Sequence, residues 1–218
     1  MDVTELIERT RAELAPAHDR LRSHPYVAAV EDGRIDLAGL RPFAGEQRAI
    51  IASDLRSVAH LVSRTGDPFF LAVLDGERAA LHALTPLAAA LGMDERELED
   101  YEPKAGAHAY AAYMAWLGAY ASAAEVAAAY LVNFEAWGHS CGRLSRALRA
   151  RHGLTAAQVR FFDAFAEDDP EFEPHALALI QAGLDAGVPE RVIRRAPRLL
   201  QAYEALFWDT LHEAAGAP

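Results

Sequence analysis

The chain of 218 residues is short of cysteine, of long apolar runs and of basic side chains. Its single cysteine, Cys141, excludes an internal disulfide framework and a cysteine-rich zinc module. No apolar stretch is long enough to span a bilayer, and the acidic N-terminus lacks the cationic head and apolar segment of a secretory signal. These absences predict a cytoplasmic protein without a membrane partner.

Basic residues are outnumbered, 21 against 32 acidic ones, which gives a formal net charge of -11. Nucleic-acid binders rely on Lys and Arg to neutralise phosphates, so this charge predicts no nucleic-acid partner. Hydrophobic residues make up 52% of the chain, enough for a sizeable core. A chain of this length and composition is typical of one domain.

Strand patterns are nearly absent, whereas signals that start and end helices recur along the chain. Thr65-Gly66-Asp67-Pro68 combines a helix stop, an N-cap and a proline suited to a first turn. Capping boxes are predicted at Asp94, Ser122 and Thr155, each followed three residues later by Glu or Gln. We predict an all-α, single-domain helical bundle over residues 1–218, with seven or eight helices. Residues 95–106 are predicted to form a loop.

The nine histidines are the compositional feature that suggests chemistry. Two of them follow an acidic residue at a spacing of seven, which is two helical turns, and one further carboxylate interrupts an apolar stretch. The candidate metal ligands are Asp75, His82, Glu135, Asp168 and His175. About one such acid–histidine pair is expected by chance, so surface or structural hydrogen bonding is the alternative for each residue.

Aromatic residues recur at helical spacing in the middle of the chain and again near its C-terminus. They predict either ordinary packing or the wall of a pocket for a flat ligand. The candidate pocket residues are Tyr110, Tyr113, Tyr130, Trp137 and Phe207. Glu204 lies four residues before Trp208, on the same helical face, and is a candidate general acid or base or a packing partner of the indole.

Several motifs appear in an order and spacing that resemble the TenA/thiaminase II and pyrroloquinoline-quinone-synthesis group. They are His24-Pro25-Tyr26, Leu40-x2-Phe43, Tyr110-x2-Tyr113, Glu125-x4-Tyr130 and Glu204-x2-Phe207-Trp208. The resemblance implies the haem-oxygenase-like fold, a small-molecule substrate, and a homo-oligomer, either a dimer or a tetramer. It also implies a catalytic role for Glu204.

Other parts of that group's catalytic set are absent from this chain. The position of the thiaminase nucleophile, a cysteine, falls at Val132-Asn133, and Cys141 lies eight residues after Asn133. The acidic residue that binds the pyrimidine falls at Gln47, next to Glu46. One hypothesis is therefore a metal-free enzyme that binds an aminopyrimidine and uses Glu204. Another is a non-catalytic ligand-binding protein.

The five candidate metal ligands resemble a second branch of the fold, the haem-oxygenase-like diiron oxidases. Asp75-x6-His82, Glu135 and the segment from Asp168 to His175 follow the order of that branch's ligands. This resemblance implies one or two iron ions as cofactor. The main hypothesis from the sequence is therefore an iron-dependent oxidase that acts on a small organic molecule.

Overall fold

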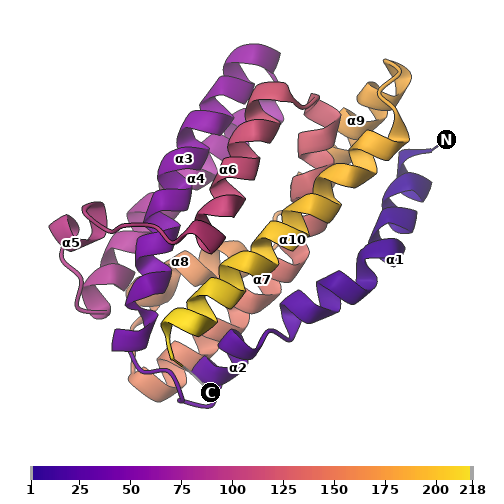
Figure 1. Ribbon diagram of the computed structural model, residues 1–218. Helices are drawn as coiled ribbons and strands as arrows, with labels where there is room; N and C mark the ends of the chain where they lie inside the picture. Colours follow the sequence, from indigo (N-terminus) through magenta and orange to yellow (C-terminus); the bar gives the residue numbers. More distant parts are fainter. Residues whose placement is uncertain (1, 217–218) are drawn as a thin grey trace.

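The computed structural model describes residues 2–216. Over that range the chain forms ten α-helices and one 3-10 turn, and no strand (Figure 1). The helices are α1 (Val3–Arg22), α2 (Pro25–Glu31), α3 (Arg41–Thr65), α4 (Pro68–Ala90), α5 (Glu95–Glu99), α6 (Ala105–Tyr120), α7 (Ala123–His152), α8 (Ala156–Ala166), α9 (Phe172–Asp185) and α10 (Glu190–Ala214). The all-α prediction is confirmed. The predicted number of helices was low because α2 and α5 are only seven and five residues long.

Local capping chemistry sets most of the helix ends. Gly66 closes α3 with a φ of 66°, a left-handed conformation that an L side chain rarely adopts. Asp67 then accepts the backbone N–H of Phe69 at 2.9 Å and starts α4. The three predicted capping boxes, at the starts of α5, α7 and α8, are all present. These boundaries follow from side chains next to each helix, which is why the sequence predicts them well.

One prediction about local structure was wrong. Residues 95–106 are not one loop, because they contain α5 and the first residues of α6. Pro197 is buried inside α10, which runs unbroken for 25 residues. The loss of one backbone hydrogen bond is tolerated there because α10 packs against both α6 and α7.

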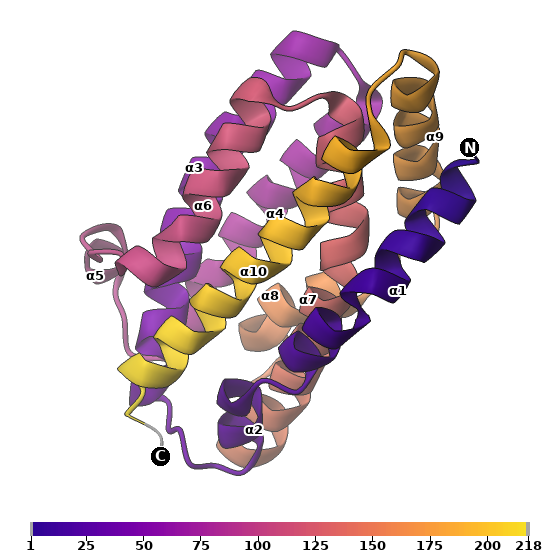
Figure 2. The same cartoon turned by 45° about the vertical axis from the view of Figure 1, so that its right-hand side comes forward.

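The longest helix, α7, forms the centre of the bundle and packs against α1, α2, α8, α9 and α10. Figures 1 and 2 show α10 running between α6 and α1, with α7 behind it. Behind α6, α3 packs against both α6 and α4. Large aromatic side chains fill the space between these helices; Phe43 of α3, Trp137 of α7 and Trp208 of α10 meet with ring centroids 5.3–6.4 Å apart.

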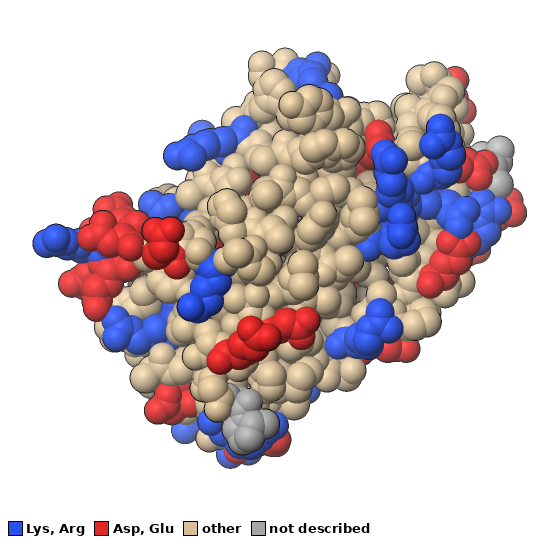
Figure 3. Space-filling view, viewed as in Figure 1, with Lys and Arg blue, Asp and Glu red and all other residues tan. Residues whose placement is uncertain are grey.

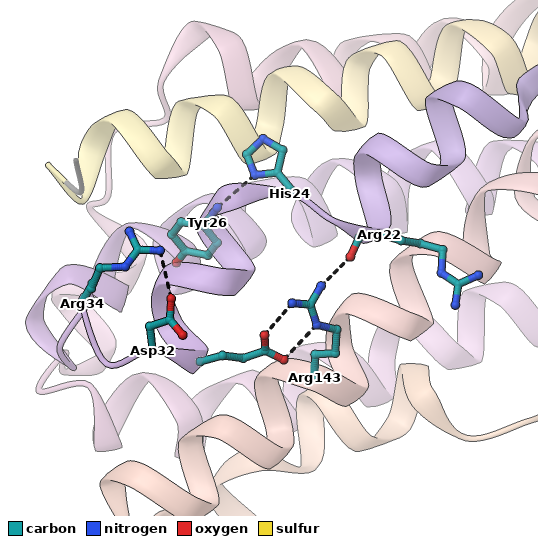
Figure 4. A network of polar contacts seen from close by, with 7 residues as sticks. Arg22, His24, Tyr26, Asp32, Arg34 and Arg143 are labelled. Atoms are coloured by element: carbon teal, nitrogen blue, oxygen red, sulfur yellow. Dashed lines mark hydrogen bonds and ion pairs between the residues drawn. The ribbon is translucent and has the colours of Figure 1, made fainter.

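A partly buried ion pair fixes the short helix α2 against α7 (Figure 4). The Arg143 guanidinium donates through Nε to Glu31 Oε1 at 2.8 Å and through Nη2 to Glu31 Oε2 at 2.5 Å. Its Nη1 donates to the carbonyl oxygen of Arg22 at the end of α1. This two-pronged geometry is the strongest form of Arg–carboxylate contact, and it also lowers the pKa of Glu31.

Charged side chains surround one broad face of the molecule but are sparse at its centre (Figure 3). The helices α6 and α10 cross this face in Figure 1. They carry three large exposed apolar side chains, Trp116, Tyr120 and Leu206, of which Tyr120 is 74% exposed. Within residues 2–216, no helix combines the length and hydrophobicity needed to cross a bilayer.

Candidate functional site

A cavity opens inside the bundle between α3, α4, α6, α7, α8 and α10, and about 40 Å³ of it is open to the centre of a water-sized sphere. Most of its wall is aromatic or aliphatic, and three carboxyl groups reach it from different helices. The lining residues are Gln47, Ile50, Ile51, Asp54, Glu77, Tyr110, Tyr130, Asn133, Phe134, Trp137, Phe165, Glu204 and Phe207. An apolar pocket with a few polar groups is the usual form of a small-molecule site.

Two helices supply most of the wall through one face each. From α3 come residues 47, 50, 51 and 54, and from α7 come residues 130, 133, 134 and 137. Both sets follow the i, i+3, i+4, i+7 pattern, so each set forms a single stripe along its helix. Polar residues stand within these stripes: Gln47 and Asp54 on α3, and Asn133 on α7. The helices therefore hold the polar groups of the cavity on rigid supports.

Glu204 of α10 is the most thoroughly buried carboxyl group in the cavity wall, at 1% exposure. Its Oε1 accepts a hydrogen bond from the indole Nε1 of Trp208 at 2.9 Å, whereas its buried Oε2 accepts no well-formed hydrogen bond from the described residues. Burial raises the pKa of Glu204 to about 7, although the donor groups of Trp208 and Asn133 offset part of the effect. The group can therefore both give and take a proton near neutral pH.

Asp54 of α3 and Glu77 of α4 form a second acidic feature of the same cavity. Asp54 is 4% exposed and its Oδ1 has no partner among residues 2–216. Burial raises the pKa of Asp54 well above its usual value, and the nearby Glu77 carboxylate raises it further. Burial also raises the pKa of Glu77 to about 7. The two groups therefore repel each other when both are ionised.

Two tyrosines, Tyr110 and Tyr130, line the same cavity as these acidic groups. Burial raises the pKa of both phenols, and the charges of Asp54 and Glu77 add to the effect. Glu204 also acts on Tyr110, so all three carboxyl groups lie within electrostatic range of that ring. Both phenols stay protonated at neutral pH and can donate hydrogen bonds to a ligand.

Four of the five predicted pocket residues line this cavity: Tyr110, Tyr130, Trp137 and Phe207. Tyr113 does not. It lies three residues further along α6, where it stacks on Trp116 with centroids 5.9 Å apart and contacts Tyr203 at 5.0 Å. Its role in the structure is to pack α6 against α10.

The five candidate iron ligands do not share a site. Asp75 and His82 lie on the exposed side of α4, Glu135 is exposed on α7, Asp168 is in the loop before α9, and His175 is exposed on α9. Their ionic neighbours are Arg78 for Asp75, His18 for Glu135 and Glu171 for His175. Within residues 2–216, no three His, Cys, Asp or Glu side chains are grouped so that they could hold a metal ion. The arrangement gives no support to an iron-dependent oxidase.

Two of the candidate iron ligands, Asp75 and Glu135, are each two residues away from a residue that lines the cavity. Glu77 and Asn133 line the cavity, whereas Asp75 and Glu135 each lie two positions earlier or later on the same helix. Two residues correspond to about 200° around an α-helix, so Asp75 and Glu135 point to the opposite side. For Asp75 and Glu135 the sequence pattern therefore indicated helices that line the cavity but residues on their opposite faces, whereas Asp168 and His175 belong to a segment that does not line it.

The position implied for a cysteine nucleophile falls at Val132-Asn133, and of these two residues Asn133 lines the cavity. Cys141, two turns further along α7, is completely buried in the core. Burial and the charge of Glu204 raise the pKa of its thiol well above the usual value, which suppresses the reactive thiolate. The described chain therefore has no cysteine nucleophile in this cavity.

Gln47 and Glu46 are neighbours with different surroundings. Gln47 lines the cavity, whereas Glu46 Oε1 accepts hydrogen bonds from the Tyr101 hydroxyl and the Lys104 backbone N–H, both at 2.9 Å. The carboxyl group of Glu46 thus anchors the α5–α6 connection to α3. At the position where the resemblance implies an acidic ligand group, the cavity presents an amide.

The sequence patterns did not indicate Asp54 and Glu77 as site residues, and Asn133 was named only at the position implied for the absent nucleophile. Helical spacing contains a signal for two of them. Glu77 lies seven residues from both Phe70 and Leu84, which are fully buried, and Asp54 lies in the buried stripe of α3. An acid on the buried side of an otherwise apolar stripe points to an internal site more directly than its spacing from a histidine does.

The helical architecture and its central cavity define the class of the protein, an all-α bundle with the haem-oxygenase-like fold. The model of the TENA/THI-4/PQQC family matches residues 11–214, and the chain belongs to that family. The chain matches no curated protein sequence at a significant level.

Solved structures agree on the fold. A domain of unknown function with a heme oxygenase-like fold from Shewanella denitrificans is 16% identical, with a TM-score of 0.75 over 98% of this chain and 93% of that one. A TenA homologue from Pseudomonas syringae is 15% identical, with a TM-score of 0.78 over 94% of this chain and 92% of that one. A TenA homologue from P. horikoshii is 15% identical, with a TM-score of 0.73 over 98% of this chain and 100% of that one.

Proposed function

We propose that this chain binds a flat, nitrogen-containing heterocycle such as an aminopyrimidine in the central cavity and transfers a proton at Glu204. The observation that carries the proposal is the Glu204 carboxyl group, which lines the cavity with one oxygen held by Trp208 and the other without a well-formed hydrogen bond. Membership of the TENA/THI-4/PQQC family and the TenA homologues among the structural neighbours support this function.

Different residues of the cavity would bind the ring and transfer the proton. Trp137 and Phe207 offer aromatic faces on which a flat ring can stack. Tyr110 and Tyr130 offer hydroxyl groups to ring nitrogens. Glu204 donates a proton to a ring nitrogen or leaving group when it is protonated, and accepts one from an attacking water when it is ionised.

Asn133 in place of a cysteine changes the route open to such a reaction. An amide does not form the covalent intermediate that a thiolate forms, so bond cleavage here would use water as the nucleophile, activated by Glu204. Binding without turnover is the alternative for a cavity that retains the acid and lacks the nucleophile.

Titration of the chain with 4-aminopyrimidine tests this proposal. We expect saturable binding in wild type, about tenfold weaker or lost in Glu204→Gln because the amide cannot share a proton with the ring. The matched control is Glu213→Gln, an exposed glutamate on the same helix, which should bind like wild type. Binding should not respond to a chelator. Absence of binding at millimolar ligand, or equal binding by Glu204→Gln, would contradict the proposal.

A further inference from the structure

The Asp54–Glu77 pair has no evident role in the chemistry assigned to Glu204. Asp54 lies on α3 and Glu77 on α4, whereas Glu204 lies on α10. Asp54 is 4% exposed, lines the cavity, and has an oxygen without any partner among the described residues. A buried carboxyl group left in that state is costly, and structural acids in proteins normally have a donor.

The cavity offers these acids no positive charge. Among the described residues that line it, three are carboxylic acids and none is Lys, Arg or His. Elsewhere in the molecule a partly buried acid does find such a partner, as Glu31 does in Arg143. Since no described cationic side chain lines the cavity, the charge of the Asp54–Glu77 pair is neutralised either by a cation from outside these residues or by a proton.

The neighbours of the pair favour an organic cation. Tyr110 and Tyr130 are within electrostatic range of both acids, and aromatic rings attract cations through their faces. A bare metal ion fits less well, since no three metal-binding side chains gather anywhere in residues 2–216. Two carboxylates and two phenol rings can surround an ammonium group, with its N–H donors directed to the carboxylate oxygens.

We propose that the Asp54–Glu77 pair is a recognition site for an ammonium group carried by the ligand of this cavity. The ligand is then an aromatic or heterocyclic amine, with its ring among the aromatic residues and its ammonium group between α3 and α4. This inference rests on the proposed function in one respect, that the cavity is the ligand site.

Calorimetric titration with phenethylamine and its neutral analogue phenethyl alcohol tests the site near neutral pH. In wild type we expect phenethylamine to bind about tenfold more tightly, as a charge-assisted hydrogen bond predicts. Asp54→Asn and Glu77→Gln should each bring the two affinities close together. The matched control is Asp75→Asn, which removes an exposed acid from the same helix as Glu77 and should keep the preference.

The outcomes separate this inference from the proposed function. If Glu204→Gln loses 4-aminopyrimidine and keeps the preference for phenethylamine, both proposals hold. If 4-aminopyrimidine binds wild type and Glu204→Gln equally while the amine preference depends on Asp54, the ammonium site stands and the acid–base role fails. Equal affinity of wild type for both phenethyl probes, binding of neither, or a preference that survives in both acid variants overturns the ammonium site. Tight Mn²⁺ binding that Asp54→Asn removes would assign the pair to a metal instead and would also overturn it.

Discussion

The surroundings of Glu204 raise its pKa and make its ionised form costly to the fold. Its carboxyl group is buried among aromatic rings with a single firm donor, the Trp208 indole, and the pKa rises to about 7 as a result. The folded chain therefore keeps a proton on Glu204 between about pH 4.5 and pH 7, where the unfolded chain has lost it. Above pH 7 the fold must accommodate a buried negative charge.

Replacing Glu204 with glutamine should therefore stabilise the protein in alkaline solution. At about pH 8 we expect the free energy of unfolding of Glu204→Gln to exceed that of wild type by about 2 kcal/mol. The reason is that each tenfold difference in proton affinity between the folded and unfolded chains corresponds to about 1.4 kcal/mol, and relaxation around the charge recovers part of the total. At about pH 5 the difference should nearly vanish, since wild-type Glu204 is then neutral as well.

Urea unfolding of both proteins at the two pH values measures this difference. The control is Glu213→Gln on the exposed side of α10, which should match wild type at both. A Glu204→Gln protein that is less stable than wild type at about pH 8 would show that the carboxylate is satisfied in the fold.

At the level of the helices, close approach of α7 and α8 shapes one wall of the cavity. A Cβ added at Gly138 of α7 would lie 2.5 Å from the carbonyl oxygen of Phe165, and Phe165 lines the cavity. Backbone cannot yield as a flexible side chain does, so any residue larger than glycine forces the two helices apart.

Gly138→Ala should accordingly destabilise the fold by about 1–3 kcal/mol through overpacking and weaken ligand binding. Gly142 lies one turn further along α7, where a Cβ meets its nearest neighbours at 3.4 Å. Gly142→Ala should be neutral or stabilising by up to about 1 kcal/mol, because alanine favours the helix. Thermal unfolding of the two variants makes the comparison. Equal melting temperatures would mean that α8 moves away without cost.

The helices also show which features the sequence could predict. Caps such as Asp67 and the Ser122–Glu125 box act on their own neighbours, so their residues alone indicate where α4 and α7 begin. The inward face of a helix depends instead on how it packs against others. Glu77 and Asp75 are both acids in the same segment, and only the position of α3 and α8 beside α4 decides which one meets the cavity.

Short connections were harder to predict for a different reason. The helix α5 has five residues and gains its position from Glu46, which binds the chain just after it through Tyr101 and Lys104. Such long-range anchoring leaves no periodic pattern in the residues of the segment itself. The aromatic wall was predictable because its α7 residues repeat at helical spacing. Asn133 was named only through the family resemblance, because an amide has no distinctive pattern of its own.

For the molecule as a whole, the buried acids should make the fold less stable as the pH rises toward 8. The pKa values of Asp54, Glu77 and Glu204 are all raised by burial, so the folded chain binds more protons than the unfolded chain at mildly acidic pH. The free energy of unfolding should therefore decrease as the pH rises from about 6 to about 8.

Acid groups with lowered pKa values act in the opposite direction only at lower pH. Arg143 lowers the pKa of Glu31, whose contribution to stability is lost as the pH falls through that lowered value. Denaturant unfolding across this range measures the net effect. Stability that is flat or increasing toward pH 8 would contradict the expected trend, and a ligand carrying an ammonium group should reduce the decline by pairing with the acids.

The homo-oligomer expected from the family resemblance stays a prediction. Light scattering of the purified chain would report a monomer, a dimer or a tetramer.

Trp208 gives the cavity an optical reporter of its own. Its indole donates to Glu204, and Trp137 forms part of the wall, whereas the third tryptophan, Trp116, is exposed on α6. Indole emission is sensitive to nearby charge and to polarity, and two of the three emitters lie where both change when a proton moves or a ligand enters. Occupancy of the cavity and ionisation of Glu204 can thus be followed by intrinsic fluorescence, without an attached dye or a coupled assay.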